Sequence, residues 1–159
     1  MNHDKALREQ LAKMIDWNEA HADFRAAVDG FPAKLRGRVP GGLPHSAWQL
    51  LEHIRLALWD ILEFSRDARH KSPNWPEGYW PKDAEPPRPG AWGKSVKAVI
   101  KHLDEMRELI TDPSRDLFAP LPHGSGQTLL REALLVGDHN AYHVGQLVLL
   151  RKALGAWEG

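Results

Sequence analysis

The most informative absence in this sequence is that of cysteine, of which its 159 residues contain none. Disulfide bonds, cysteine-ligated zinc and a cysteine nucleophile are therefore all excluded. Any bound metal must instead be held by histidine, aspartate or glutamate side chains. The lack of cysteine also fits a protein of a reducing compartment.

An excess of charge and long hydrophobic runs are lacking as well. The 21 basic and 21 acidic residues give a formal net charge of zero, whereas proteins that bind nucleic acids or anionic membranes usually carry a basic excess or patch. No apolar run approaches the ~18 residues that indicate a membrane span. The opening residues MNHDKALREQ lack the apolar core of a signal peptide. We expect a cytoplasmic protein that binds neither nucleic acid nor membrane.

Strand patterns are also missing, because β-branched residues never alternate with polar ones over a useful length. Apolar residues recur instead at steps of three and four, which is typical of amphipathic helices. Ser46 and Gln49 form a capping-box pattern that marks one helix start. The length suits one domain with a single core. We predict one all-α domain over residues 1–159, a four-helix bundle with helices at about 4–29, 46–68, 92–110 and 128–155.

The connection between the second and third predicted helices, RHKSPNWPEGYWPKDAEPPRPGA, is much longer than a bundle normally needs. An extended segment of this length can travel more than a helix length, so a crossover is as feasible as simple alternation. Trp75, Tyr79 and Trp80 give it aromatic surface to bury. Either it seals the core, or it forms the wall of a pocket.

Two histidines lie four residues apart in an otherwise apolar helix, in the stretch DHNAYHVGQ. This spacing places His139 and His143 on one helix face, with Gln146 about one turn further on. His53 lies on the inward face of the second predicted helix. Three imidazoles are costly to bury as bare polar groups, but they become favourable when they share a cation. Three protein ligands with an open fourth position are also the arrangement of catalytic zinc.

A zincin-type general base is not available, because the residues between His139 and His143 do not form an HExxH motif. A purely structural trio of histidines therefore remains the alternative to a metal site.

These features together resemble the DinB-like (YfiT-like) four-helix bundle superfamily. The likeness spans nearly the whole chain and rests on His53 seven residues after the helix N-cap, on SAWQLLEHIR, on SPNWPEGYWP and on DHNAYHVGQLVLLRKALG. It implies an up-down-down-up topology with a long crossover between helices two and three. It also implies a three-histidine site for a divalent metal, zinc or nickel, in which His53, His139 and His143 match the ligands. Since the ligands come from two helices only, we expect one metal ion per chain.

The resemblance says less about the reaction, because the superfamily includes thiol-dependent transferases and isomerases, hydrolases and stress-associated proteins. We expect a metal-dependent hydrolase or small-thiol-dependent transferase that acts on a small-molecule substrate; its catalytic residues are not identified. Any thiol would have to come from a low-molecular-weight cofactor such as bacillithiol or mycothiol, since the chain has no cysteine. The alternative is a non-catalytic metal- or ligand-binding bundle of the stress response.

Four further side chains are candidates for binding a cofactor. The first predicted helix turns polar at Asn18, His21 and Arg25, on the half that points toward the start of the second helix. These residues either lie near the metal or form an exposed flank. Arg25 would suit a substrate carboxylate, which a guanidinium binds with two hydrogen bonds. Gln146 is the fourth candidate, either beside the ligands or in helix packing.

A homodimer is a further expectation, because family members often pair through helix faces. Trp17, Trp48 and Trp59 are predicted on the outer sides of helices. They would form the dimer seam or pack against the long connection.

Overall fold

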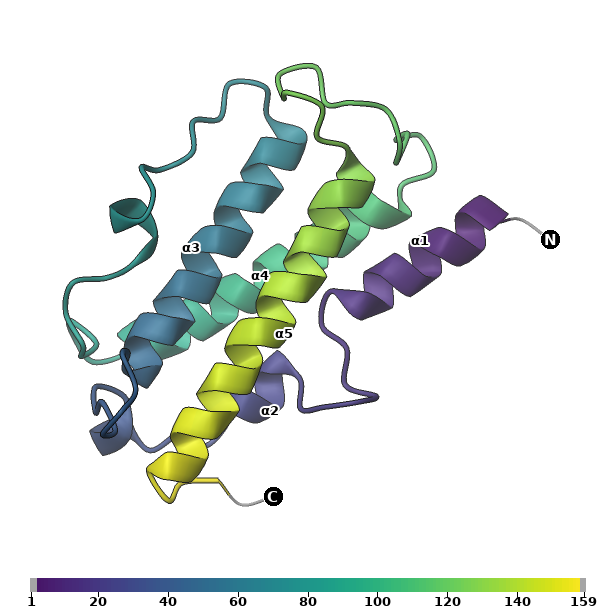
Figure 1. Ribbon diagram of the computed structural model, residues 1–159. Helices are drawn as coiled ribbons and strands as arrows, with labels where there is room; N and C mark the ends of the chain where they lie inside the picture. Colours follow the sequence, from purple (N-terminus) through teal and green to yellow (C-terminus); the bar gives the residue numbers. More distant parts are fainter. Residues whose placement is uncertain (1–2, 158–159) are drawn as a thin grey trace.

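The computed structural model describes residues 3–157, and in this range the protein is all-α (Figure 1). The prediction of an all-α bundle is confirmed. Four long helices and one short helix follow one another along the chain, with two short 3-10 turns, Ala33–Leu35 and Glu77–Tyr79, in the connections. The helices are α1 (His3–Met14), α2 (Phe24–Val28), α3 (Ala47–Arg66), α4 (Ala91–Thr111) and α5 (Leu129–Ala153).

The prediction of one continuous helix over 4–29 is wrong, because the chain leaves the helix after Met14 and resumes it at Phe24. Two aspartates explain the break. The Asp16 carboxylate accepts a hydrogen bond from the Phe24 backbone N–H, and the Asp23 carboxylate caps Ala26. Short acidic side chains compete in this way with helical hydrogen bonds and favour helix starts. The spacing of three and four runs on through the break, but its members there, Asn18, His21 and Arg25, are polar.

The predicted capping box at the start of α3 is confirmed. The Gln49 backbone N–H donates to the Ser46 hydroxyl, and the Gln49 side chain accepts from the Ser46 backbone N–H. The same two side chains also hold the long connection, since Ser46 donates to the Ala84 carbonyl and Gln49 to the Pro81 carbonyl. The helix start and the end of the connection are therefore fixed together.

Helices α3 and α4 run in the same direction. Glu52 and Ser95 are hydrogen-bonded near the start of both helices, and Arg66 and Glu105 form an ion pair further along both. Helix α5 runs opposite to α3, as Figure 1 shows. The connection between α3 and α4 returns along the bundle to make this arrangement.

The core is made by apolar residues that all the helices contribute. The side chains that are almost fully buried include Phe24, Ile54, Leu58, Leu62, Leu103, Met106, Ile110 and Leu147. Within the described residues, no helix combines the length and the apolarity that a membrane crossing requires.

The tryptophans proposed for a dimer seam are mostly used inside the chain. Trp48 is only 5% exposed, which corrects its expected place on an outer side, and Trp59 packs edge-on against His70 of the long connection. Trp17 is 39% exposed. The homodimer stays a prediction.

Candidate metal centre

Three histidines from two facing helices converge at one point. His53 projects from α3, and His139 and His143 project from successive turns of α5. A ring nitrogen of each lies within 4.8 Å of those of the other two, and Nε2 of His53 is 3.1 Å from Nε2 of His139. His53 is 2% and His143 6% exposed, while His139 is half-buried. The three histidines therefore face the interior, as predicted.

Hydrogen bonds at the opposite nitrogens orient two of the rings. His53 Nδ1 lies 3.1 Å from the Tyr79 carbonyl, and His143 Nδ1 lies 2.8 Å from Gln146 Oε1. A carbonyl oxygen can only accept, so Nδ1 of each ring carries the proton and Nε2 carries the free lone pair. Metal-binding histidines usually have such a partner on the nitrogen that does not bind the metal.

Burial lowers the pKa of all three histidines. It lowers the pKa of His139 to about 3, with His143 and His53 adding to the effect. It lowers the pKa of His53 to about 4, although the hydrogen bond to Tyr79 opposes the shift. The pKa of His143 is also lowered by burial, against the effect of Gln146. The rings are therefore neutral at neutral pH, which is the form that binds metal ions.

This donor set fits a divalent metal ion. Two imidazoles on one zinc ion, at Zn–N distances of ~2.0–2.1 Å, place their nitrogens roughly 3–3.4 Å apart. The 3.1 Å between His53 and His139 falls in this range. Neutral imidazole suits zinc, nickel, copper and iron, so the donor set does not choose among them. Without an ion, one of these two ring nitrogens must carry a proton and donate a hydrogen bond to the other.

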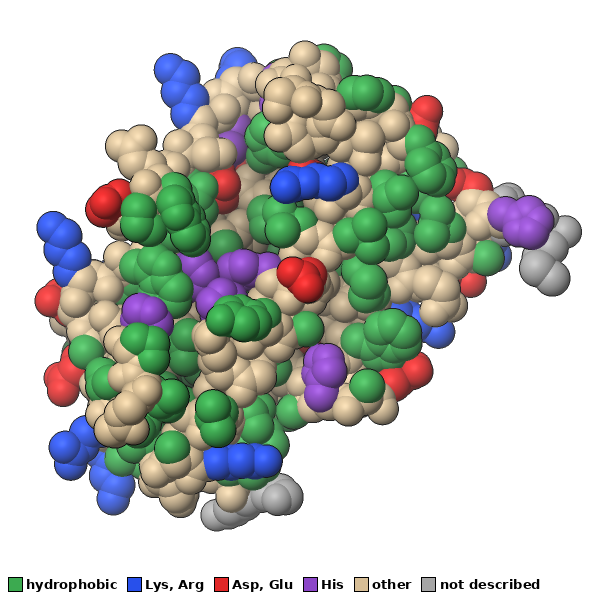
Figure 2. Space-filling view, viewed as in Figure 1, with side chains coloured by type: hydrophobic (Ala, Val, Ile, Leu, Met, Phe, Trp, Pro, Cys, Tyr) green, Lys and Arg blue, Asp and Glu red, His purple; other side chains and the backbone are tan. Residues whose placement is uncertain are grey.

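The histidines form part of the wall of a cavity of about 400 Å³ that opens to solvent between α3, α5 and the long connection. Figure 2 shows histidine side chains gathered in a hollow on this face. The connection contributes Trp75 and Tyr79, so the structure favours the wall of a pocket over a simple seal of the core. The other lining residues are Ala57, Asp60, Ile61, Leu135, Asp138 and Tyr142.

Trp80 of the same connection stacks on the His53 ring, with centroids 3.8 Å apart and an angle of 5° between the planes. His45 also stacks on the Trp80 ring, with centroids 4.0 Å apart and an angle of 17° between the planes. The connection thus fixes His53 twice, through the Tyr79 carbonyl and through this stack. The sequence does not predict this contact of His45, because a contact between two loops leaves no periodic signal.

Sequence analysis also missed a polar cluster at the side of this pocket. Asp60 accepts a hydrogen bond from the Tyr79 hydroxyl at 2.6 Å, and its other oxygen lies 2.7 Å from His70 Nε2. Asp60 lies seven residues after His53 on α3, two helix turns further along the same face, so its inward position follows from the sequence. Its contacts with Tyr79 and His70 of the long connection do not.

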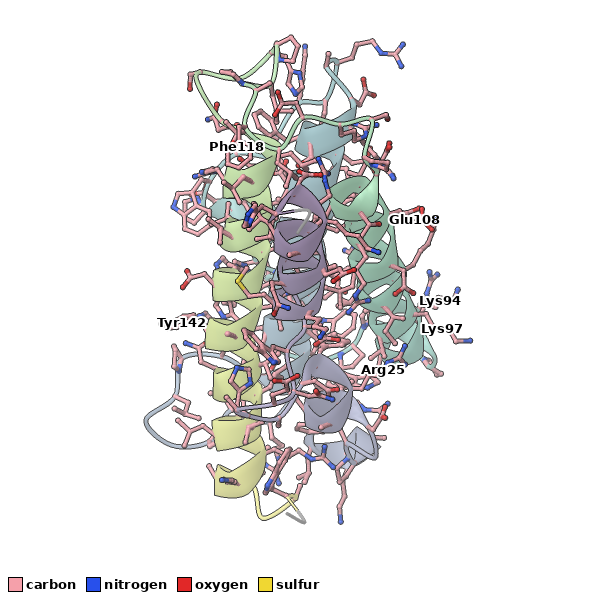
Figure 3. All side chains as sticks on the ribbon, turned by 90° about the vertical axis from the view of Figure 1, so that its right-hand side faces the viewer. Arg25, Lys94, Lys97, Glu108, Phe118 and Tyr142 are labelled. Carbon is pink, nitrogen blue, oxygen red and sulfur yellow. The ribbon has the colours of Figure 1, made fainter. Side chains whose placement is uncertain are left out.

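The remaining candidate residues divide into two groups. Gln146 contacts His143 directly. Asn18, His21 and Arg25 are exposed, and none of them lines the histidine pocket. Figure 3 shows Arg25 and Tyr142, a pocket residue, on opposite sides of the molecule. The break after Met14 explains this, since Asn18 and His21 lie in a connection and not on the expected helix face.

Comparison with family models finds a match. A model of the DinB superfamily matches residues 16–147, which is most of the chain and includes all three histidines. The chain belongs to the DinB superfamily. Searches of curated proteins and of solved structures find no match. The comparison therefore supports the superfamily and its fold, and it gives this DinB-like chain no particular reaction.

The lowered histidine pKa values predict an acid-sensitive metal-free protein. Below the ordinary histidine pKa of ~6.5, the unfolded chain binds protons that the folded His53 and His139 do not. In EDTA, the free energy of unfolding should therefore fall as the pH drops from 6.5 to 5, by up to roughly 1.4 kcal/mol per pH unit for each such histidine. Urea unfolding at several pH values measures this slope. His139→Ala should flatten this slope; equal slopes in wild type and His139→Ala would contradict the prediction.

Proposed function

We propose that this DinB-like protein is a metal-dependent enzyme whose single divalent ion, zinc or nickel, is held by His53, His139 and His143. The observation that supports this best is the convergence of three neutral imidazoles at the edge of an open cavity. A purely structural trio would be expected to lie sealed in the core, whereas these rings border space for a small-molecule substrate. Pockets of a few hundred Å³ are typical of such ligands.

A divalent ion at this site would supply Lewis-acid chemistry and lower the pKa of a coordinated water or thiol toward neutrality. The protein's own part is to hold the rings. The Tyr79 carbonyl and the Trp80 ring fix His53, and Gln146 fixes His143.

The Asp60 cluster would bind the far end of the substrate. Two helix turns separate Asp60 from His53, which is roughly 10 Å along the axis of α3, so a substrate at the metal would extend along this helix to reach Asp60. Burial and the Asp60 hydrogen bond raise the pKa of Tyr79 to about 12. The Tyr79 hydroxyl therefore stays protonated at neutral pH and donates a hydrogen bond to the Asp60 carboxylate. The remaining lone pairs of the carboxylate can accept from a substrate N–H or O–H group.

Hydrolysis of a small ester or amide and transfer of a small thiol would both use this site. A thiol would come from a low-molecular-weight cofactor, because the chain has no cysteine. A non-catalytic metal- or ligand-binding protein is the second candidate. The composition of the cluster favours this candidate. Among the described residues, the cluster contains three histidines and no carboxylate that would serve as a general base beside the ion.

The metal site is tested by melting experiments on protein purified without an affinity tag. Wild type and His143→Ala are each melted with EDTA and with zinc. Zinc should raise the melting temperature of wild type, since a ligand that binds the folded state stabilises it, and the rise should be lost in the variant. His102→Ala, the same substitution on α4, should keep the full zinc response. Equal zinc responses in wild type and His143→Ala would defeat the assignment of His143 as a ligand.

The reaction is tested with a panel of ester, amide and thiol-conjugation substrates on metal-loaded protein. Asp60→Asn keeps the shape of the side chain but removes its charge, so we expect KM to rise by about tenfold with a smaller change in kcat. The Asp60→Asn protein should still bind zinc. If metal-loaded wild type turned over no substrate yet bound a small ligand, the non-catalytic alternative would replace the enzyme.

A further inference from the structure

The pocket beside the three histidines is apolar between its polar ends. Along α3, Ala57 follows His53 by one turn and Asp60 by a second, so the two polar ends are roughly 10 Å apart on this helix. The nearby lining of the two helices is hydrocarbon, with Ala57 and Ile61 on α3 and Leu135 on α5. A substrate that reaches from one polar end to the other must therefore cross apolar surface.

Two exposed aromatic rings border the same pocket from different elements. Trp75 of the long connection is 70% exposed, and Tyr142 of α5 is 64% exposed. The Trp75 ring meets the Tyr79 ring at a tilt, with centroids 5.5 Å apart. The Tyr142 ring meets His143 at nearly a right angle, with centroids 4.9 Å apart. At these exposures each ring keeps an open face, which suits an aromatic or other flat apolar group.

Ala57 leaves room for such a group. It is the smallest of the described residues that line the pocket, and it lies between the proposed metal ligand His53 and Asp60. A cavity of about 150 Å³ holds one benzene ring, whereas this pocket has about 400 Å³. The space is therefore sufficient for a ring with a substituent at each end, and a larger side chain at position 57 would project into it.

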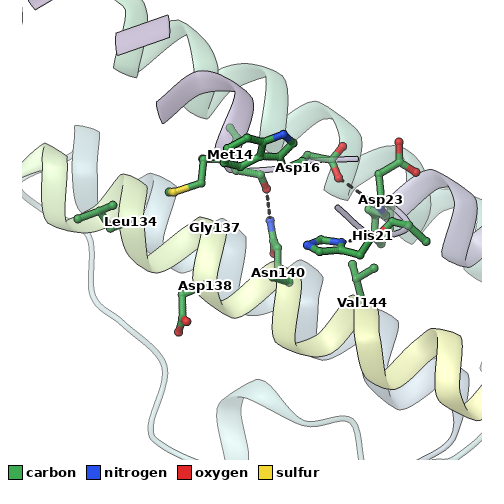
Figure 4. A pocket seen from close by; sticks show the side chains of 14 residues that line it. Met14, Asp16, His21, Asp23, Leu134, Gly137, Asp138, Asn140 and Val144 are labelled. Atoms are coloured by element: carbon green, nitrogen blue, oxygen red, sulfur yellow. Dashed lines mark hydrogen bonds between the residues drawn. The ribbon is translucent and has the colours of Figure 1, made fainter. Parts of the chain in front are cut away.

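The charge around the pocket restricts the far end of the substrate. Asp60 and Asp138 line the pocket, and none of the described lysines or arginines does. Asp138 is exposed, and Figure 4, a close view of a neighbouring cavity, shows its carboxylate on the side of α5 away from Asp16 and His21. An anionic group away from the metal would face two carboxylates, which is unfavourable. A hydroxyl or amino donor is therefore expected there.

We propose that the substrate carries a flat apolar group, such as an aromatic ring, between the end that binds the metal and a hydroxyl or amino donor for Asp60. Ala57 is then a specificity-determining residue, and Trp75 and Tyr142 pack against the ring. This inference rests on the proposed metal site, and it adds the class of substrate that the site accepts.

A series of hydroxamates probes this pocket by isothermal titration of the zinc-loaded protein, without any turnover. Acetohydroxamate carries the metal-binding group alone, benzohydroxamate adds the ring, and 4-(hydroxymethyl)benzohydroxamate adds the donor. In wild type, the ring should tighten binding by at least about tenfold, because it buries apolar surface against the pocket. The acid 4-carboxybenzohydroxamate should bind about tenfold more weakly than the hydroxymethyl compound, because its charge faces two carboxylates.

Variants of the wall separate the ring site from the metal site. Ala57→Leu fills the middle of the pocket, so it should abolish the gain from the ring while acetohydroxamate still binds. Tyr142→Ala removes an exposed ring from α5 and should reduce the gain by about threefold. Phe118→Ala removes a ring that is 60% exposed and outside the pocket, so it should leave the gain unchanged.

The outcomes distinguish this inference from the metal site on which it rests. Acetohydroxamate binding to wild type without a gain from the ring, or an equal gain in wild type and Ala57→Leu, would overturn the inference and leave the metal site in place. An unchanged gain in Tyr142→Ala would overturn it too, which keeps the test decisive should Ala57→Leu not fold. Failure of acetohydroxamate to bind zinc-loaded wild type would overturn the metal site and this inference with it.

Discussion

The structure depends on the burial of three neutral imidazoles between α3 and α5. Each ring must leave water, which opposes protonation and lowers its pKa. Two of the rings are oriented by a hydrogen bond on one nitrogen, and the other nitrogen faces the cluster. Without a cation, His139 Nε2 and His53 Nε2 must share a hydrogen bond across 3.1 Å, and the lone pair of His143 is left without a donor among the three rings. A bound cation satisfies that constraint most simply, and the fold supplies the rest of the site around it.

The long connection between α3 and α4 is part of this site as much as the helices are. Its Tyr79 carbonyl and its Trp80 ring both act on His53, and its Trp75 and Tyr79 side chains line the pocket. The capping residues Ser46 and Gln49 hold its far end. The crossover connection therefore also positions His53 and shapes the space beside it.

The all-α class, three of the four long helices and the inward position of His53, His139 and His143 could be predicted from the sequence. These features repeat with the helical period or follow local capping chemistry, both of which are visible within a few residues. The helix break after Met14 was not predicted, because the spacing of three and four runs on through the polar residues Asn18, His21 and Arg25. The hydrogen bonds of Asp16 and Asp23 at the start of the next helix end the first one. Contacts between distant segments, such as Trp80 with His45 or Tyr79 with Asp60, leave no pattern in the sequence.

The central claim, that His53, His139 and His143 hold one metal ion, is tested most directly by X-ray diffraction at the zinc absorption edge. Crystals of tag-free protein grown with zinc would be measured above and below the edge. The claim predicts a single strong anomalous peak per chain, within about 2.0–2.1 Å of one nitrogen of each ring. The strongest peak lying elsewhere, or no peak between the three rings, would contradict it.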